Sequence, residues 1–218
     1  MNNRAVIFDM DGVICHTNPF HAEAFKQFFD RRSIPYTEQE FVDHMYGKHN
    51  SYIMQYFLKK ELNAVEVKVL EEEKERLFRE IYKNHVEPIS GFLEFLTTLK
   101  QAGYKTGVAT SAPRANLDMI LHILGFKNQI ESILSSEDVN AHKPNPEVYL
   151  KTAGNLCVVP TNCIVFEDSF SGVTAAINAG MKVIGVLSSH TEKELPPCNG
   201  YIRDYHDIHL DDIDALFA

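Results

Sequence analysis

The sequence predicts an α/β protein: a doubly wound parallel sheet with a block of helices inserted after its first strand. Two observations lead to this prediction. From Pro88 onward, strand and helix patterns alternate regularly, which is typical of a parallel sheet covered by helices. Residues 18–87 follow the first strand pattern and look helical throughout. We therefore expect a core domain formed by residues 1–17 and 88–218, and a helical domain formed by residues 18–87.

The first strand is expected at residues 4–8 (RAVIF), a short apolar run. In the helical block, HAEAFKQFFD places four apolar residues on one face of a helix: Ala22, Phe25, Phe28 and Phe29. A second segment, AVEVKVLEEEKERLFREIYKNH, is typical of a long, highly charged amphipathic helix. An insert placed here would lie over the carboxyl end of the first strand, the edge where open α/β sheets bind ligands.

The elements expected after Pro88 alternate in type. Helices are predicted over residues 90–102, 113–124, 145–156 and 170–179, and strands over residues 104–110, about 130–134, 163–167 and 182–187. Gly103, Gly125 and Gly180 end three of these helices. From Leu195 we expect a loop, a short edge strand and a final helix.

The composition is that of a globular protein: 218 residues, 44% of them hydrophobic. A net charge of -9 argues against nucleic acid or an anionic membrane as partner, since both require a basic face. No apolar run approaches the ~20 residues that span a bilayer, and the N-terminus lacks a signal-peptide pattern. The four cysteines form no CxxC pair and are expected to be reduced thiols. We expect a cytoplasmic protein and a monomer.

Acidic residues follow the first strand. Asp9 and Asp11 are separated only by Met10, and Gly12 permits a small ligand to approach the backbone closely. A single Asp here could simply close a turn or cap a helix. However, nothing between Asp11 and Pro19 resembles a helix start that needs a cap, so the pair is a candidate site.

Two further strand ends carry polar residues. Thr110 and Ser111 follow the strand KTGVAT and precede Pro113, an arrangement that favours an anion at a helix start, although an ordinary helix cap has the same geometry. Glu167 and Asp168 end the strand CIVFED, where helix capping by Asp168 or Ser169 is again the alternative.

Two pairs of carboxylates at one sheet edge would repel each other, and no charge partner is evident among them. This predicts a hard divalent cation, Mg²⁺. A phosphate beside these acids would need a positive group. Lys143, between His142 and Pro144 in AHKPNPEVY, is the candidate, although a lone Lys is ordinarily a solvated surface residue.

Four segments, DMDGV, VATSAPR, HKPNPEVY and VFEDSFSGVTAAINAGM, resemble in order and spacing the four motifs of the haloacid dehalogenase superfamily. The insert resembles the small helical cap of the branch that contains β-phosphoglucomutase and many sugar-phosphate phosphatases. The resemblance covers essentially the whole chain. It implies a Rossmann-like core with an α-helical cap domain.

The resemblance also implies roles for the motif residues. Asp9 would be the nucleophile that forms an aspartyl-phosphate. Asp11 would protonate the leaving oxygen and then activate the attacking hydroxyl or water, with its backbone carbonyl on Mg²⁺. Thr110, Ser111 and Lys143 would hold the phosphoryl oxygens. The metal site would comprise Asp9, Asp11, Glu167 and Asp168.

In this branch the cap selects the substrate. His21 matches a His of mutase-like members, although the pattern alone favours a polar residue on the first turn of a cap helix. In MYGKHNSYIM, the mutases' Lys and Arg, which grip a second phosphate, are replaced by the neutral Tyr46 and Asn50. Lys48 and His49 could supply charge from other positions, and Arg114 is a further candidate for substrate contact.

Loss of the second-phosphate grip favours water as the final acceptor. We therefore predict a phosphatase acting on a small phosphate monoester, a sugar or polyol phosphate. The alternative is a β-phosphoglucomutase that interconverts β-glucose 1-phosphate and glucose 6-phosphate. A dehalogenase or a non-catalytic binding protein of the same fold also stays open, but Asp11 argues against both.

Overall fold

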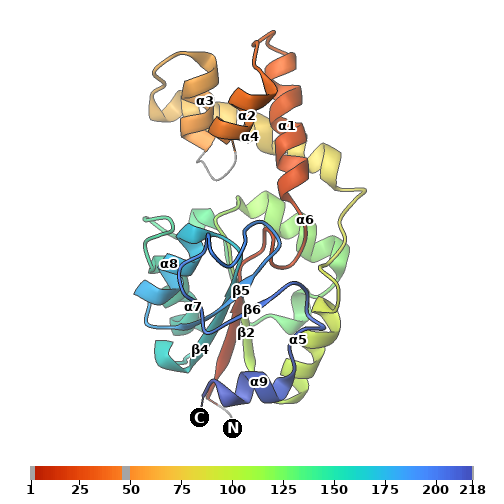
Figure 1. The fold of residues 1–218 in the computed structure, drawn as a ribbon, viewed down its shortest axis with the longest axis vertical. Coiled ribbons are helices and arrows are strands. Elements are labelled where there is room, and N and C mark those ends of the chain that lie inside the picture. Colours follow the sequence, from red (N-terminus) through yellow and green to blue (C-terminus); the bar gives the residue numbers. More distant parts are fainter. Residues whose placement is uncertain (1–2, 46–49, 218) are drawn as a thin grey trace. The chain divides into compact units, whose positions relative to one another are not determined.

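The core is a parallel sheet, as predicted (Figure 1). The computed structural model describes residues 3–45 and 50–217. Six strands lie in the order β3-β2-β1-β4-β5-β6. They are β1 (Ala5–Phe8), β2 (Lys105–Ala109), β3 (Ser132–Leu134), β4 (Cys163–Glu167), β5 (Lys182–Val186) and β6 (Gly200–Ile202). The last of these is the short edge strand expected after Leu195.

The strand order places β1 between β2 and β4, so the chain winds to one side of β1 first and to the other side afterwards. Phe8 pairs with Val108 of β2 and with Phe166 of β4. The carboxyl ends of these three strands therefore lie side by side at the point where the winding reverses. This is the position at which doubly wound sheets bind ligands.

Among the residues that the structure describes, five helices accompany the sheet: α5 (Phe92–Gln101), α6 (Arg114–Leu124), α7 (Glu147–Asn155), α8 (Phe170–Asn178) and α9 (Leu210–Ala215). Short 3₁₀ turns are η1 (Lys127–Gln129), η2 (Ser136–Asp138) and η3 (Pro160–Asn162). The first four of these helices begin and end within two residues of the predicted ranges, and α9 is the expected final helix.

All four residues of β1 are fully buried, as expected for a parallel strand with helices on both faces. Ala5 and Ile7 point into one apolar layer, which includes residues of α7 and α8 such as Val148 and Val173. Phe8 points to the opposite face and packs in an aromatic layer against Phe92, Phe166 and Tyr205. Because successive side chains of β1 point to opposite faces of the sheet, this one strand contributes to the apolar layer on each face.

The inserted block is a separate helical unit with an aromatic core. It comprises α1 (Asn18–Asp30), α2 (Glu38–Met45), α3 (Asn50–Leu58) and α4 (Ala64–Tyr82). The four residues that the sequence places on one face of α1 are all buried. Phe29 lies in ring contact with Phe41 and Phe57, which joins α1 to α2 and α3. Asn63 and Glu66 form a capping box at the start of α4.

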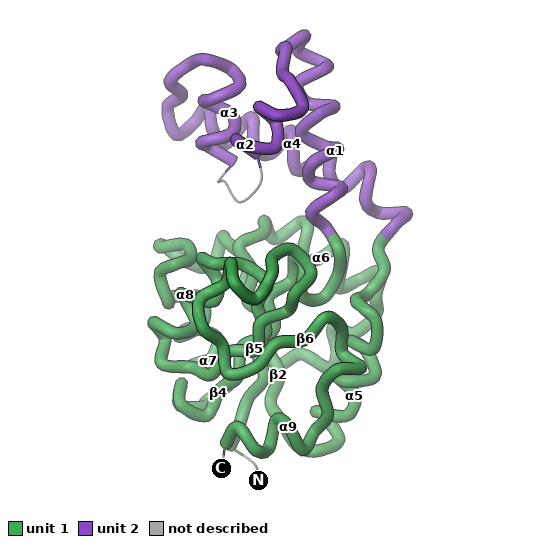
Figure 2. Tube along the Cα trace, in the orientation of Figure 1, with its two compact units in different colours: residues 1–16, 86–218 green, residues 17–85 purple. Residues whose placement is uncertain are grey.

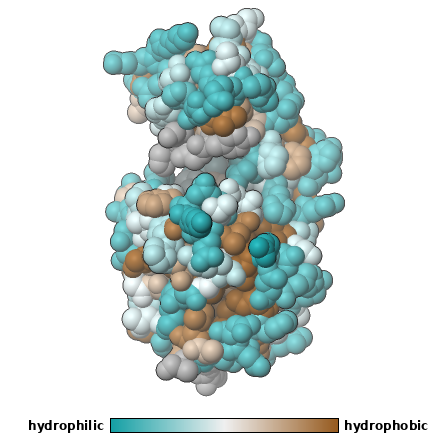
Figure 3. Space-filling model, in the orientation of Figure 1, coloured by the Kyte–Doolittle hydropathy of each residue, from teal (hydrophilic) through white to brown (hydrophobic). Residues whose placement is uncertain are grey.

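The chain divides into two compact units (Figure 2). Unit 1 comprises residues 1–16 and 86–218, and unit 2 comprises residues 17–85. The expected boundaries were one residue later at the first join and two residues later at the second. On the face drawn in Figure 3, hydrophilic residues dominate the surface of unit 2 and hydrophobic residues gather over part of unit 1.

None of the helices among the described residues combines the length and the apolar composition that crossing a bilayer requires. No disulfide joins the four cysteines, all of which lie among the described residues.

Candidate active site

The ends of β1 and β4 bring three carboxylates together. The backbone N–H of Asp9, directly after β1, donates to the carbonyl of Phe166 at 3.0 Å. This bond sets Asp9 beside Glu167 and Asp168 at the end of β4. The three residues expose only 4%, 1% and 5% of their surface, respectively. Their charges therefore interact in a space that is largely removed from water.

Lys143 lies among these carboxylates. Its Nζ is 2.6 Å from Asp9 Oδ1, 2.7 Å from Glu167 Oε1 and 3.1 Å from the carbonyl oxygen of Ala109. The three donors of the ammonium thus have three acceptors. The expectation that the acidic pairs have no charge partner in the protein is therefore wrong: a residue distant in sequence supplies one, because the loop before α7 returns to the same sheet edge.

Glu167 is held by the protein on both oxygens. Oε1 accepts from Lys143 and from the hydroxyl of Tyr149 at 3.0 Å. Oε2 accepts from the backbone N–H groups of Asp168 and Ser169 and from the Ser169 hydroxyl. Gly172 leaves room for this carboxylate, since a Cβ there would lie 1.6 Å from Oε1. The proposed metal contact of Glu167 stays a prediction.

The electrostatics of the site fit a divalent cation. Burial, with the nearby charges of Glu167 and Asp11, raises the pKa of Asp9 to about 7 although Lys143 acts in the opposite direction. Burial also raises the pKa of Asp168 well above its ordinary value, and Glu167 and Asp9 add to this effect. The pKa of Lys143 is raised, because the attraction of Asp9 and Glu167 outweighs its burial.

The ammonium of Lys143 contacts Asp9 and Glu167. A hard cation would relieve the remaining repulsion among the four carboxylates and keep the acids ionised. Oxygen donors of this kind suit Mg²⁺. Among the described residues, however, no three side chains of His, Cys, Asp or Glu are already arranged as a metal-binding group. The donor chemistry fits the ion, and the ligand set itself stays a prediction.

The turn after Asp9 packs tightly against β4. Gly12 has a φ of +71°, and a Cβ there would lie 2.0 Å from Asp168 Oδ2. The backbone N–H of Gly12 donates to the carbonyl of Cys15 at 2.9 Å, and that of Ile14 donates to Met10. Both the conformation and the close approach therefore require glycine. This folded turn carries Asp11 two residues after the nucleophile candidate.

The loop after β2 holds the phosphate-binding candidates. The buried Thr110 accepts from the N–H of Ala112 at 3.0 Å through its hydroxyl, and Ser111 is exposed. The N–H of Arg114 at the start of α6 already donates to Glu137 Oε1 at 3.1 Å. A protein carboxylate thus uses part of the predicted anion site.

The guanidinium of Arg114, a candidate for substrate contact, donates to Asp138 and to the carbonyl of Ile133. These contacts tie the start of α6 to η2 and to the middle of β3.

Unit 2 contains a buried polar cluster that includes two predicted cap residues. Lys74 Nζ lies 2.8 Å from His21 Nδ1 and 2.8 Å from Glu75 Oε1, and the Asn50 amide donates to the same oxygen at 3.1 Å. His21 also stacks on Phe78 with ring centroids 3.8 Å apart. Tyr46, Lys48 and His49 lie outside the described residues.

Several residues of these clusters are not predicted from the sequence: Lys74, Glu75, Tyr149, Ser188, Ser189 and His190. One signal was available for Lys74, which precedes the apolar Phe78 by four positions and so shares its helix face. The Ser188–His190 loop has no such signal, because its contacts to Gly12 and Asp168 join distant parts of the chain.

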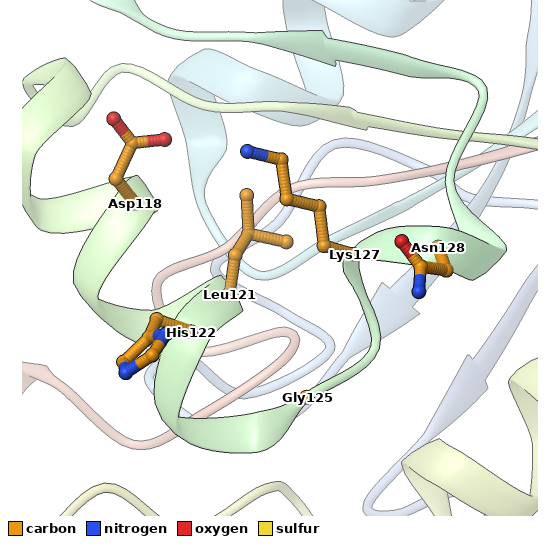
Figure 4. A pocket seen from close by; sticks show the side chains of 6 residues that line it. All are labelled: Asp118, Leu121, His122, Gly125, Lys127 and Asn128. Carbon is orange, nitrogen blue, oxygen red and sulfur yellow. The ribbon is translucent and has the colours of Figure 1, made fainter.

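A pocket of about 310 Å³ between α6 and η1 lies apart from these residues (Figure 4). It is lined by Asp118, Leu121, His122, Gly125, Lys127 and Asn128. None of the predicted site residues belongs to it, so it is not the site assembled at the strand ends.

The chain is similar to known proteins in both sequence and structure. The family model of haloacid dehalogenase-like hydrolases matches residues 6–186. A phosphorylated carbohydrates phosphatase of Thermotoga maritima is 34% identical over 194 residues, which cover 85% of this chain and 86% of that protein. A β-phosphoglucomutase of Bacillus subtilis is 29% identical over 192 residues, which cover 84% of this chain and 83% of that protein.

The fold also matches a solved structure. The crystal structure of a haloacid dehalogenase hydrolase (family IA, variant 3) from Entamoeba histolytica superposes with a TM-score of 0.92 at 29% identity, covering 98% of each chain. The segment that the family model matches, residues 6–186, includes Asp9, Lys143 and Asp168. The chain belongs to the haloacid dehalogenase-like hydrolases, a family of enzymes.

Proposed function

We propose that this hydrolase is an Mg²⁺-dependent phosphatase that acts on a small phosphate monoester, a sugar or polyol phosphate. The observation that carries the proposal is the assembly of Asp9, Lys143, Glu167 and Asp168 at the point where the winding of the sheet reverses. Family membership and the similarity to a phosphatase of phosphorylated carbohydrates support it.

Asp9 is the proposed nucleophile. Its carboxylate oxygen attacks phosphorus and the ester oxygen leaves, which forms an aspartyl-phosphate; water then attacks phosphorus and releases inorganic phosphate and Asp9. The carboxylate must be ionised for the attack, and its pKa of about 7 results from its burial and from the charges around it. Lys143 holds one oxygen of Asp9 and orients the side chain at the end of β1.

Asp11 is the proposed acid and base. In the first step it gives a proton to the leaving oxygen, and in the second it takes one from the attacking water. Thr110, Ser111 and Lys143 would bind the phosphoryl oxygens. The side chains of Asp9, Glu167 and Asp168, with the backbone carbonyl of Asp11, would hold Mg²⁺. When bound, the ion would neutralise charge between the anionic nucleophile and the anionic phosphate.

A mutase is the second candidate, supported by the similarity to a β-phosphoglucomutase. Unit 2 favours the phosphatase instead. The amide of Asn50 occupies one position at which mutases carry a second-phosphate ligand, and it donates to Glu75 within its own unit. A neutral amide bound in this way is a weak partner for a second phosphate. The cytoplasmic location and the monomeric state stay predictions from the sequence.

One experiment distinguishes the two candidates. Purified protein with Mg²⁺ is incubated with β-glucose 1-phosphate, with and without catalytic β-glucose 1,6-bisphosphate, and then with a panel of sugar and polyol phosphates. Free phosphate and glucose 6-phosphate are measured together. Phosphate release from at least one substrate supports the phosphatase. Rapid formation of glucose 6-phosphate without phosphate release would establish the mutase and overturn the argument from Asn50.

A further inference from the structure

The loop after β5 makes three contacts with the site from consecutive residues. The Ser188 hydroxyl donates to the carbonyl of Gly12, and the Ser189 hydroxyl donates to Asp168 Oδ2. His190 Nδ1 lies 2.9 Å from the backbone carbonyl oxygen of Asp168. One short loop therefore holds both the turn that follows the proposed nucleophile and Asp168, the carboxylate directly after β4.

These contacts determine which carboxylate oxygen of Asp168 is left to bind a ligand. Oδ2 accepts from Ser189 and abuts Gly12, where a Cβ would lie 2.0 Å away. Among the described residues, Oδ1 accepts no hydrogen bond. The Asp168 side chain is therefore held from one side, with the other oxygen left for a ligand outside the protein. Asp168 is 5% exposed, so water contributes little to holding it.

We propose that Ser189 is a positioning residue for divalent-cation binding by Asp168, and that Ser188 holds the Gly12 turn in place beside Asp168. The inference rests on the proposed function, in which Asp168 ligates Mg²⁺. A hydroxyl that donates to a ligating carboxylate sets its rotamer before the metal arrives. Loss of such an outer partner typically weakens metal binding by about 10–100-fold.

The test measures metal binding directly, with the full chain and without substrate. Titration calorimetry with MgCl₂, and Mn²⁺ binding followed by electron paramagnetic resonance, give dissociation constants for the wild type and each variant. Ser189→Ala should weaken binding by about tenfold or more. Ser189→Thr keeps the hydroxyl and should bind within about threefold of the wild type.

The same loop offers a matched control. The hydroxyl of Thr191 donates to a carboxylate of its own, Glu194 Oε2 at 2.7 Å, away from Asp168. Thr191→Ala removes an equivalent hydrogen bond and should leave the dissociation constant unchanged. Melting temperatures measured without metal separate a loss of folding from a loss of binding. If Ser189→Ala does not fold, Ser189→Cys keeps the size of the side chain with a much weaker donor.

The possible outcomes distinguish the positioning role of Ser189 from the proposed metal site on which that role depends. Weaker binding by Ser189→Ala alone, with rescue by Ser189→Thr, supports the inference. If the wild type binds Mg²⁺ and Ser189→Ala, or Ser189→Cys in its place, binds it equally well, the positioning role is wrong and the proposed function stands. If the wild type binds neither Mg²⁺ nor Mn²⁺ at millimolar concentration, the proposed metal site is wrong, and the positioning role with it.

Discussion

The ammonium of Lys143 lies 2.6 Å from Asp9 Oδ1 and 2.7 Å from Glu167 Oε1, and it joins the ends of two neighbouring strands. The three side chains are at most 6% exposed. Buried ion pairs of this kind are not a large source of net stability, but removal of one partner leaves a charge without compensation. Lys143 thus contributes to both the fold and the site.

Lys143→Ala should therefore lower the free energy of unfolding by about 3–5 kcal/mol. The physical reason is that Asp9 and Glu167 would remain buried beside each other without their common cation. Urea denaturation at pH 7 without Mg²⁺ measures the change.

Lys151→Ala is the matched control. Lys151 pairs with Glu147 on the same helix, but its side chain is 44% exposed. Its removal should cost less than about 1 kcal/mol. If the two variants lost equal stability, the assignment of Lys143 to a buried ionic cluster would be wrong.

Gly172 should not tolerate alanine. In an ordinary helix, Gly→Ala stabilises by about 1 kcal/mol. Here the new Cβ would lie 1.6 Å from Glu167 Oε1 and would displace that carboxylate from Lys143 and Tyr149. We expect Gly172→Ala to be destabilised by about 1–3 kcal/mol.

Gly154 in α7 provides the comparison for Gly172, because a Cβ there meets nothing within 4 Å. Gly154→Ala should gain about 0.5–1 kcal/mol. Urea midpoints of the two variants give the sign directly, and stabilisation of both would contradict the described packing of Glu167.

Asp138 should make the free energy of unfolding depend on pH in the acidic range. Burial alone would raise its pKa, but the hydrogen bonds from Ser135 and Arg114 prevail and lower it below the ordinary value of 3.8. The contribution of Asp138 to the free energy of unfolding is therefore fully present above the pKa of its carboxyl group in the unfolded chain. It is lost as the pH falls through the lower pKa of that group in the folded protein.

The test compares the wild type with Asp138→Asn in urea between pH 7 and pH 3. The stability advantage of the wild type should be constant at neutral pH and should shrink below about pH 4. An advantage that grows on acidification would mean that the carboxyl group is not held in its ionised form.

Much of the fold could be predicted because its signals are local. Alternating strands and helices, with glycines at helix ends, indicate a parallel sheet, and the structure confirms it. The strand-end residues Asp9, Thr110 and Glu167 could be placed together for the same reason, since parallel strands present their carboxyl ends at one edge.

The contacts of the site could not be predicted in the same way. Lys143 reaches Asp9 across 134 positions of sequence, and Ser188 reaches Gly12 across 176. No periodic pattern reports such a contact. In unit 2, Lys74 and Glu75 lie within the charged segment EEEKERLFRE, where two buried charges resemble their exposed neighbours.

The most direct test of the account compares the wild type with Asp9→Asn for Mg²⁺-dependent phosphate release from the best substrate of the panel. Asn is nearly isosteric with Asp but lacks the anionic oxygen that attacks phosphorus. We expect release by the wild type to require Mg²⁺, and release by Asp9→Asn to fall below about 10⁻³ of that rate while the far-ultraviolet circular dichroism spectrum is unchanged. Substantial release by a folded Asp9→Asn variant would contradict the assignment of Asp9 as the nucleophile.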